Sequence, residues 1–175
     1  MQRLQELAIN YPGRVDKLVL ACTWAKTDGT SGISSEFIKA AEAYEKSSHD
    51  VVSQRRLAGI MMDLQINKWS YRVFLLPLMK IAIRFSIRSS SPKPGVAEQM
   101  EAGSAHDAAD RLGMIKASTL VITGTEDRLI NPVSSEVIAS LIPKAKLVKV
   151  SGGSHSFSIE MRGEFNKEVL DFLQH

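Results

Sequence analysis

The stretch TLVITGTEDRLINP, residues 119–132, decides the fold class of this sequence. An aliphatic and β-branched run ends in a turn that contains Gly124 and Asp127, and a helical pattern follows. The stretch LVKVSGGSHSF, residues 147–157, has the same form and carries His155 after two glycines. Both stretches are typical of buried strands that end in tight glycine-containing turns.

The neighbouring segments alternate between helical and strand patterns. Apolar residues recur at helical spacing over residues 2–11, and VDKLVLAC, residues 15–22, indicates a buried strand. Helical patterns follow the two later strands, at residues 132–142 and 158–174. Strands that alternate with helices predict an α/β fold, here with a parallel sheet of about three strands and flanking helices. We assign residues 1–25 and 113–175 to this core.

Residues 26–112 are helical in pattern and predict an inserted cap. Ser34 or Ser35 and Asp50 are suitable N-caps for two helices. A third helix crosses Pro77, which predicts a bend, and residues 96–112 predict one or two short helices. Such a cap can cover a ligand pocket, although plain helical packing explains the same pattern. If a pocket exists, we expect it to favour a hydrophobic acyl or aryl group and to be lined by Met61, Met62, Phe74, Leu78 and Met79.

The composition excludes several classes of protein. The 175 residues include 22 Lys or Arg and 19 Asp or Glu, and the net charge of +3 gives no sign of nucleic-acid binding. Cys22 is the single cysteine, so we expect neither a disulfide framework nor a cysteine-based zinc site. The first residues lack the apolar core of a secretory signal, and we expect a cytoplasmic protein. The apolar segment 71–88 is interrupted by Pro77 and Lys80 and is too short to span a membrane. An amphipathic helix at a membrane surface is the alternative for that segment.

Asp127 and His155 occupy equivalent positions in the sequence, one strand–helix–strand unit apart. Consecutive strands joined by right-handed crossovers usually lie side by side, so the two turns should be neighbours at the carboxyl edge of the sheet. A carboxylate beside an imidazole fixes its tautomer and stabilises the imidazolium while the other ring nitrogen takes a proton. Taken singly, the Asp also fits an Asx-turn or a helix N-cap, and the His fits an ordinary loop residue.

Four stretches of the sequence resemble an α/β-hydrolase of the esterase, lactonase and haloperoxidase-like type. They are INYPGRVDKLVLACT, TLVITGTEDRLINP, IPKAKLVKVSGGSHSF and EFNKEVLDFL. The resemblance is to the carboxyl-terminal half of that family and implies Asp127 as the orienting acid and His155 as the general base of a Ser-His-Asp triad. It implies hydrolysis of a carboxylic ester or a lactone as the activity.

The sequence departs from the family pattern at the nucleophile. The family's G-x-S-x-G elbow precedes the helix that corresponds to residues 2–11, and these 175 residues contain neither the elbow nor the earlier loop that contributes to the oxyanion hole. We therefore expect the chain to be truncated, with the serine upstream or on a separate chain, and to be inactive alone.

Cys22 is the alternative nucleophile, because it ends a predicted strand at the same edge of the sheet. A lone cysteine at a buried strand end is more often a small apolar residue. We expect no cofactor and no metal, because the sequence lacks the HxH and HExxH spacings of common metal sites and a glycine-rich phosphate loop.

Two functions from different classes remain open at this point. The first is a hydrolase that contributes Asp127 and His155 to a triad and acts on a small-molecule ester or lactone. The second is a catalytically inactive, truncated hydrolase that serves as a self-associating or binding module. The exposed edge of a short sheet favours association, so the expected partners are a second copy of the chain or a complementing amino-terminal half.

Overall fold

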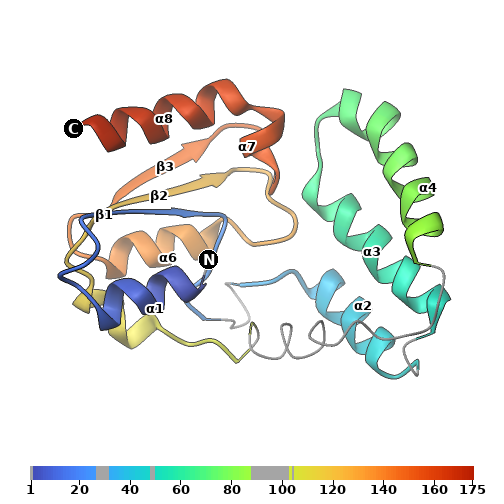
Figure 1. Ribbon diagram of the computed structural model, residues 1–175, viewed down its shortest axis with the longest axis horizontal. Coiled ribbons are helices and arrows are strands. Elements are labelled where there is room, and N and C mark those ends of the chain that lie inside the picture. Colours follow the sequence, from blue (N-terminus) through green and yellow to red (C-terminus); the bar gives the residue numbers. More distant parts are fainter. Residues whose placement is uncertain (1, 27–31, 48–49, 88–102, 104) are drawn as a thin grey trace.

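A parallel sheet forms the centre of the computed structural model, which describes residues 2–26, 32–47, 50–87, 103 and 105–175 (Figure 1). Within these residues the strand order is β1-β2-β3, and both pairs of neighbouring strands are parallel. The register pairs Leu20 with Val121 and Val121 with Leu147. The strands are β1 (Lys17–Ala21), β2 (Ser118–Gly124) and β3 (Lys146–Val150).

Helices cover both faces of the sheet (Figure 1). On one face lie α1 (Gln2–Asn10), the 3-10 helix η2 (Ala109–Met114) and α6 (Val133–Leu141). On the other lie α7 (Phe157–Glu160) and α8 (Arg162–Gln174). Side chains of a strand point alternately to the two faces, so Val121 packs towards α6 while Leu120 and Ile122 pack with Phe157 and α8. The predicted α/β fold with a parallel sheet and flanking helices is confirmed.

The segment that the sequence analysis assigns to a cap is helical, and two of its helices begin where the sequence predicts them. The hydroxyl of Ser34 accepts a hydrogen bond from the Phe37 N–H, and the carboxylate of Asp50 accepts one from the Ser53 N–H at 2.9 Å. Each cap satisfies a backbone donor that the first helical turn leaves free. The elements are α2 (Ser35–Glu45), α3 (Val51–Gln65), the π-helical turn η1 (Tyr71–Leu75) and α4 (Leu76–Ser86).

Pro77 follows the change from the π-helical turn η1 to the α-helix α4. A proline within a helix has no N–H to donate and its ring collides with the preceding turn. The backbone responds here with a wider π-helical turn that ends two residues before Pro77. The sequence predicts a bend at Pro77, and the feature that the structure has at this place is a π-helical turn, which was not predicted.

Two predicted segments differ from the structure. Residues 158–174 were expected to form one helix, but the chain breaks at Met161, where φ is −129° and ψ is 45°, between α7 and α8. Residues 96–102 and 104 of the segment 96–112 lie outside the described residues. Its last part packs in the core rather than in the cap: the Ala108 N–H donates to the Ala25 carbonyl at 2.9 Å, and Leu112 is fully buried beside α1 and α6.

In the described part of the chain, no helix has both the length and the apolar character needed to cross a membrane.

Candidate active site

Backbone contact between two glycines joins the turns that follow β2 and β3. A Cβ atom built on Gly124 would lie 2.1 Å from the Gly153 carbonyl oxygen, so only glycine allows this approach. The Thr125 N–H donates to the Val150 carbonyl at 3.0 Å, and the Glu126 N–H donates to the Gly153 carbonyl at 2.8 Å. The two turns therefore form one rigid unit at the carboxyl edge of the sheet.

Asp127 and His155 meet inside this unit. Oδ1 of Asp127 accepts hydrogen bonds from the N–H groups of Leu129 at 2.9 Å and Ile130 at 2.8 Å. Oδ2 lies 2.8 Å from Nδ1 of His155. The Asx-turn and the carboxylate–imidazole pair are thus both present, one on each oxygen of the same carboxylate. The Asp127 side chain has no exposed surface, whereas that of His155 is 24% exposed.

The contact with Asp127 fixes the chemical character of the imidazole. Because Nδ1 faces a carboxylate that can only accept, we assign the hydrogen to Nδ1, which leaves Nε2 of the neutral ring as a proton acceptor. Among the described residues, no side chain or backbone group forms a hydrogen bond with Nε2. The arrangement is that of a general base with an orienting acid.

Cys22 lies at the same edge, one residue after β1, and adopts a left-handed backbone conformation with φ of 46°. Its sulfur lies within 4.8 Å of the candidate ligand atoms of Asp127 and His155. Burial raises the pKa of the Cys22 thiol to about 12, and the negative charge of Asp127 acts in the same direction. A thiol that stays protonated at neutral pH is a poor nucleophile, so the geometry does not favour Cys22 in that role.

Comparisons with known proteins agree with the observed fold. Residues 64–161, more than half of the chain and the part that holds Asp127 and His155, match the alpha/beta hydrolase fold family. The chain belongs to this family.

Individual members of the α/β-hydrolase family cover the whole chain. A putative carbamate hydrolase RutD from Rhizobium rhizogenes is 27% identical over 170 residues, which are 97% of this chain and 62% of that protein. The enol-lactonase from Burkholderia xenovorans has a TM-score of 0.73 at 24% identity, covering 98% of this chain and 61% of its own. A hydrolase from Pseudomonas aeruginosa has a TM-score of 0.73 at 25% identity, and the match covers 98% of this chain and 60% of that hydrolase. Nearly the whole of this chain aligns with these carbamate hydrolase relatives, but the alignment spans only about 60% of the length of each relative.

Glu160 belongs to the site of this α/β-hydrolase chain and was missed by the sequence analysis. It is buried, and Oε1 accepts hydrogen bonds from the N–H groups of Asn67 at 3.1 Å and Lys68 at 2.8 Å. Oε2 accepts a hydrogen bond from the hydroxyl of Ser154, the residue before His155. The carboxylate therefore ties the His155 turn to the segment between α3 and η1. A carboxylate between the apolar residues Ile159 and Met161 was the only local signal.

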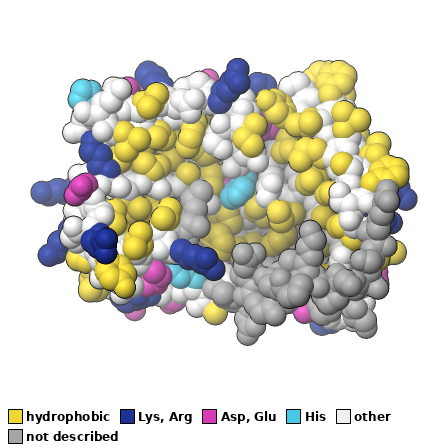
Figure 2. All heavy atoms as spheres, in the orientation of Figure 1, with side chains coloured by type: hydrophobic (Ala, Val, Ile, Leu, Met, Phe, Trp, Pro, Cys, Tyr) yellow, Lys and Arg dark blue, Asp and Glu magenta, His cyan; other side chains and the backbone are white. Residues whose placement is uncertain are grey.

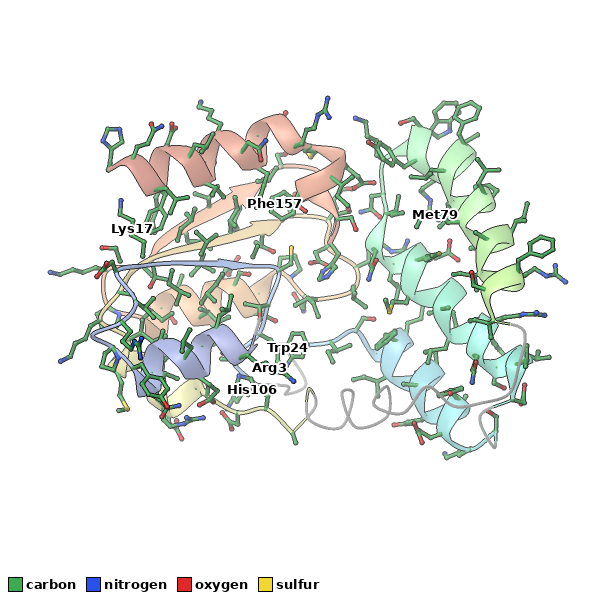
Figure 3. All side chains as sticks on the ribbon, viewed as in Figure 1. Arg3, Lys17, Trp24, Met79, His106 and Phe157 are labelled. Carbon is green, nitrogen blue, oxygen red and sulfur yellow. The ribbon has the colours of Figure 1, made fainter. Side chains whose placement is uncertain are left out.

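The predicted pocket residues lie on α3, η1 and α4. Phe74 and Leu78 are 65% and 63% exposed, and Met61 is 40% exposed. Met62 and Met79 are half-buried, and Figure 3 shows Met79 on α4. In Figure 1, α4 lies on the side of α3 that faces away from the sheet. The role of these five side chains in substrate binding stays a prediction.

Proposed function

We propose that this chain supplies the acid and the base of a hydrolase that cleaves a carboxylic ester or a lactone. Asp127 orients the imidazole and stabilises its charged form, and His155 accepts a proton through Nε2. A serine hydroxyl from outside these 175 residues serves as the nucleophile. The observation that carries the proposal is the 2.8 Å contact between Oδ2 of Asp127 and Nδ1 of His155 at the carboxyl edge of the sheet.

The proposed reaction follows from that contact. Nε2 takes the hydroxyl proton as the serine oxygen attacks the acyl carbon, and the imidazolium later gives the proton to the leaving alcohol. The carboxylate of Asp127 stabilises the imidazolium between these steps. Since its other oxygen is held by two backbone N–H groups, the carboxylate needs no reorganisation when the charge appears. Water then attacks the acyl-enzyme with His155 again acting as the base.

The relatives support the substrate class. Their names describe a putative carbamate hydrolase and an enol-lactonase, both of which break a bond at an acyl carbon. The predicted preference for a hydrophobic acyl or aryl group depends on the apolar side chains of the cap. A small-molecule ester or lactone is therefore the proposed substrate.

A fluorophosphonate probe, which labels activated serines, tests this proposal. The purified chain alone should remain unlabelled. The same chain joined to an amino-terminal segment with a G-x-S-x-G elbow should be labelled and should hydrolyse aryl esters. His155→Ala in that protein should reduce kcat by about 10⁴-fold or more, and Asp127→Ala should reduce it less. Full turnover in both variants would remove the triad assignment, and labelling of the chain alone would show a nucleophile within it.

A second candidate function is a non-catalytic, self-associating module. In the described residues β1 pairs only with β2, so its other edge is open, and unpaired strand edges are sites of association. Failure of the joined protein to bind the probe, together with a stable oligomer of the chain, would favour this candidate.

A further inference from the structure

Each of the three neighbouring strands is followed by a side chain that can bind a metal ion. Cys22 follows β1, Asp127 follows β2 and His155 follows β3. Their candidate ligand atoms all lie within 4.8 Å of one another, and Nδ1 of His155 and Oδ2 of Asp127 are 2.8 Å apart. A thiol, a carboxylate and an imidazole thus converge on one point although they are far apart in the sequence.

These three ligand types suit a soft or borderline divalent cation. Zinc binds thiolate sulfur at about 2.3 Å and imidazole nitrogen or carboxylate oxygen at about 2.0–2.2 Å, in tetrahedral geometry. Ligand atoms of such a shell lie roughly 3.3–3.8 Å apart, as follows from those bond lengths. The cluster therefore needs only small side-chain movements to enclose the ion, and three protein ligands leave the fourth position for water.

The surroundings hold the ligands in place. Oδ1 of Asp127 is engaged by the Leu129 and Ile130 N–H groups, so Oδ2 is the oxygen that can turn to a cation. The Cys22 N–H donates to the Ile122 carbonyl at 3.0 Å, which fixes the start of the turn that presents the sulfur. Such outer contacts orient metal ligands and are important for affinity. The His155 side chain is 24% exposed, so an ion can reach the three ligands from solvent at this residue.

We propose that Cys22, Asp127 and His155 form a three-ligand site for a divalent cation of the zinc or cadmium class. On binding, the Cys22 thiol loses its proton to solvent as the sulfur–metal bond forms. The ion takes the place between Oδ2 and Nδ1, and the hydrogen of the neutral imidazole moves to Nε2. The net change is the uptake of one cation and the release of one proton. The lack of metal-binding spacing in the sequence is no obstacle, because the fold brings the ligands together from three strands.

The site deepens the proposed function but is testable without it. If His155 is the base, a bound cation removes its contact with Asp127 and leaves hydrogen on Nε2, so the ion inhibits the hydrolase. Metal binding itself depends only on the three side chains, so failure of the hydrolase proposal leaves this one standing.

Cadmium chloride titration of the purified chain gives a direct readout. A cadmium–thiolate bond has an ultraviolet charge-transfer band, and Cys22 is the single cysteine, so any such band belongs to it. The band should saturate at one cadmium per chain, and zinc chloride should displace it. His155→Ala and Asp127→Asn should each weaken the affinity at least tenfold. His175→Ala is the matched control and should leave the affinity unchanged.

Two results would overturn the site. One is the absence of the band in the unsubstituted chain with equimolar cadmium. The other is an unchanged cadmium affinity in His155→Ala, which would mean that the thiol binds without the proposed partner. Circular dichroism of each variant shows whether the fold is kept. His155→Ala carries the test if Asp127→Asn does not fold, because it leaves Asp127 with the two hydrogen bonds that Oδ1 accepts from the Leu129 and Ile130 N–H groups.

Discussion

At the scale of single residues, Cys22 should react slowly with thiol-modifying reagents in the folded, metal-free chain. Its side chain is buried and burial raises its pKa to about 12, so little thiolate exists near pH 8. A chromogenic disulfide reagent should therefore react with Cys22 at least a hundredfold more slowly in the native chain than in the denatured chain. The denatured chain is the control, since it holds the same thiol without the fold. Equal rates in the two states would contradict the burial of this residue.

His106 should make stability depend on mildly acidic pH. Burial lowers the pKa of this imidazole from 6.5, and Nε2 lies 3.0 Å from Oε1 of Gln5. Below pH 6.5 the unfolded chain binds a proton that the folded chain resists, so the free energy of unfolding falls as the pH falls through this range. Urea unfolding at several pH values measures how steeply the free energy of unfolding changes with pH, and His106→Gln should make this slope smaller. His175→Gln, at the exposed carboxyl terminus, should leave the slope unchanged.

The sequence alone predicts the two central residues of the candidate site but not the third. Asp127 and His155 lie in recognisable turns after two strands. These strands are parallel neighbours in the sheet, so the sequence also predicts that the two residues lie close to each other. Glu160 binds the backbone of Asn67 and Lys68, more than 90 residues earlier in the chain. Any residue can offer a backbone N–H, so the sequence has no signal for such a partner.

At the scale of elements, the contact between the two site turns depends on Gly124. A methyl group there would collide with the Gly153 carbonyl, so Gly124→Ala must push the turns apart. We expect a loss of about 2–4 kcal/mol in the free energy of unfolding, from overpacking against backbone. Gly163→Ala is the matched control: its added Cβ meets nothing within 4 Å, and alanine favours the helix by up to about 1 kcal/mol. Equal stability of both variants in urea unfolding would exclude the close approach.

Glu160 should control how firmly the cap is held to the core. Glu160→Ala leaves the N–H groups of Asn67 and Lys68 without their acceptor, which we expect to cost about 2–3 kcal/mol. Hydrogen exchange at these two amides should accelerate more than exchange in β2. Glu160→Gln keeps one acceptor oxygen and should be milder, and Glu164→Gln, on the exposed side of α8, should have no effect. Unchanged protection of both amides in Glu160→Ala would contradict this role.

Local signals account for the elements that the sequence predicts, and tertiary contacts account for those it does not. Ser34 and Asp50 cap α2 and α3 through side chains only three residues from their partners. The break at Met161 has no such local signal. Met161 follows Glu160, whose carboxylate accepts hydrogen bonds from the Ser154 hydroxyl and the Asn67 N–H. These contacts hold the end of α7 in place and separate it from α8.

At the scale of the whole molecule, the order of patterns along the chain predicts the layered core, because each strand and helix must bury one apolar side. The surface of the cap was not predicted. Figure 2 shows hydrophobic side chains gathered over the cap, at the right of the view. Trp69, Phe74 and Leu78 are 71%, 65% and 63% exposed. The rings of Trp69 and Phe74 pack edge to face, with 6.2 Å between their centroids. The sequence pattern marks these residues as apolar but cannot show that the helix turns them outward.

This exposed apolar face and the open edge of β1 together predict self-association. Two copies that cover Phe74 and Leu78 would each remove apolar surface from water, at roughly 25 cal/mol per Å² buried. Phe74→Ser with Leu78→Ser should therefore raise the dimer dissociation constant at least tenfold in sedimentation equilibrium. Leu170→Ser with Leu173→Ser, on α8, removes apolar side chains of comparable exposure and should have little effect. If the α8 pair weakens association and the cap pair does not, the contact lies on the core and the cap face has another role; a chain that stays monomeric throughout would exclude the self-associating module.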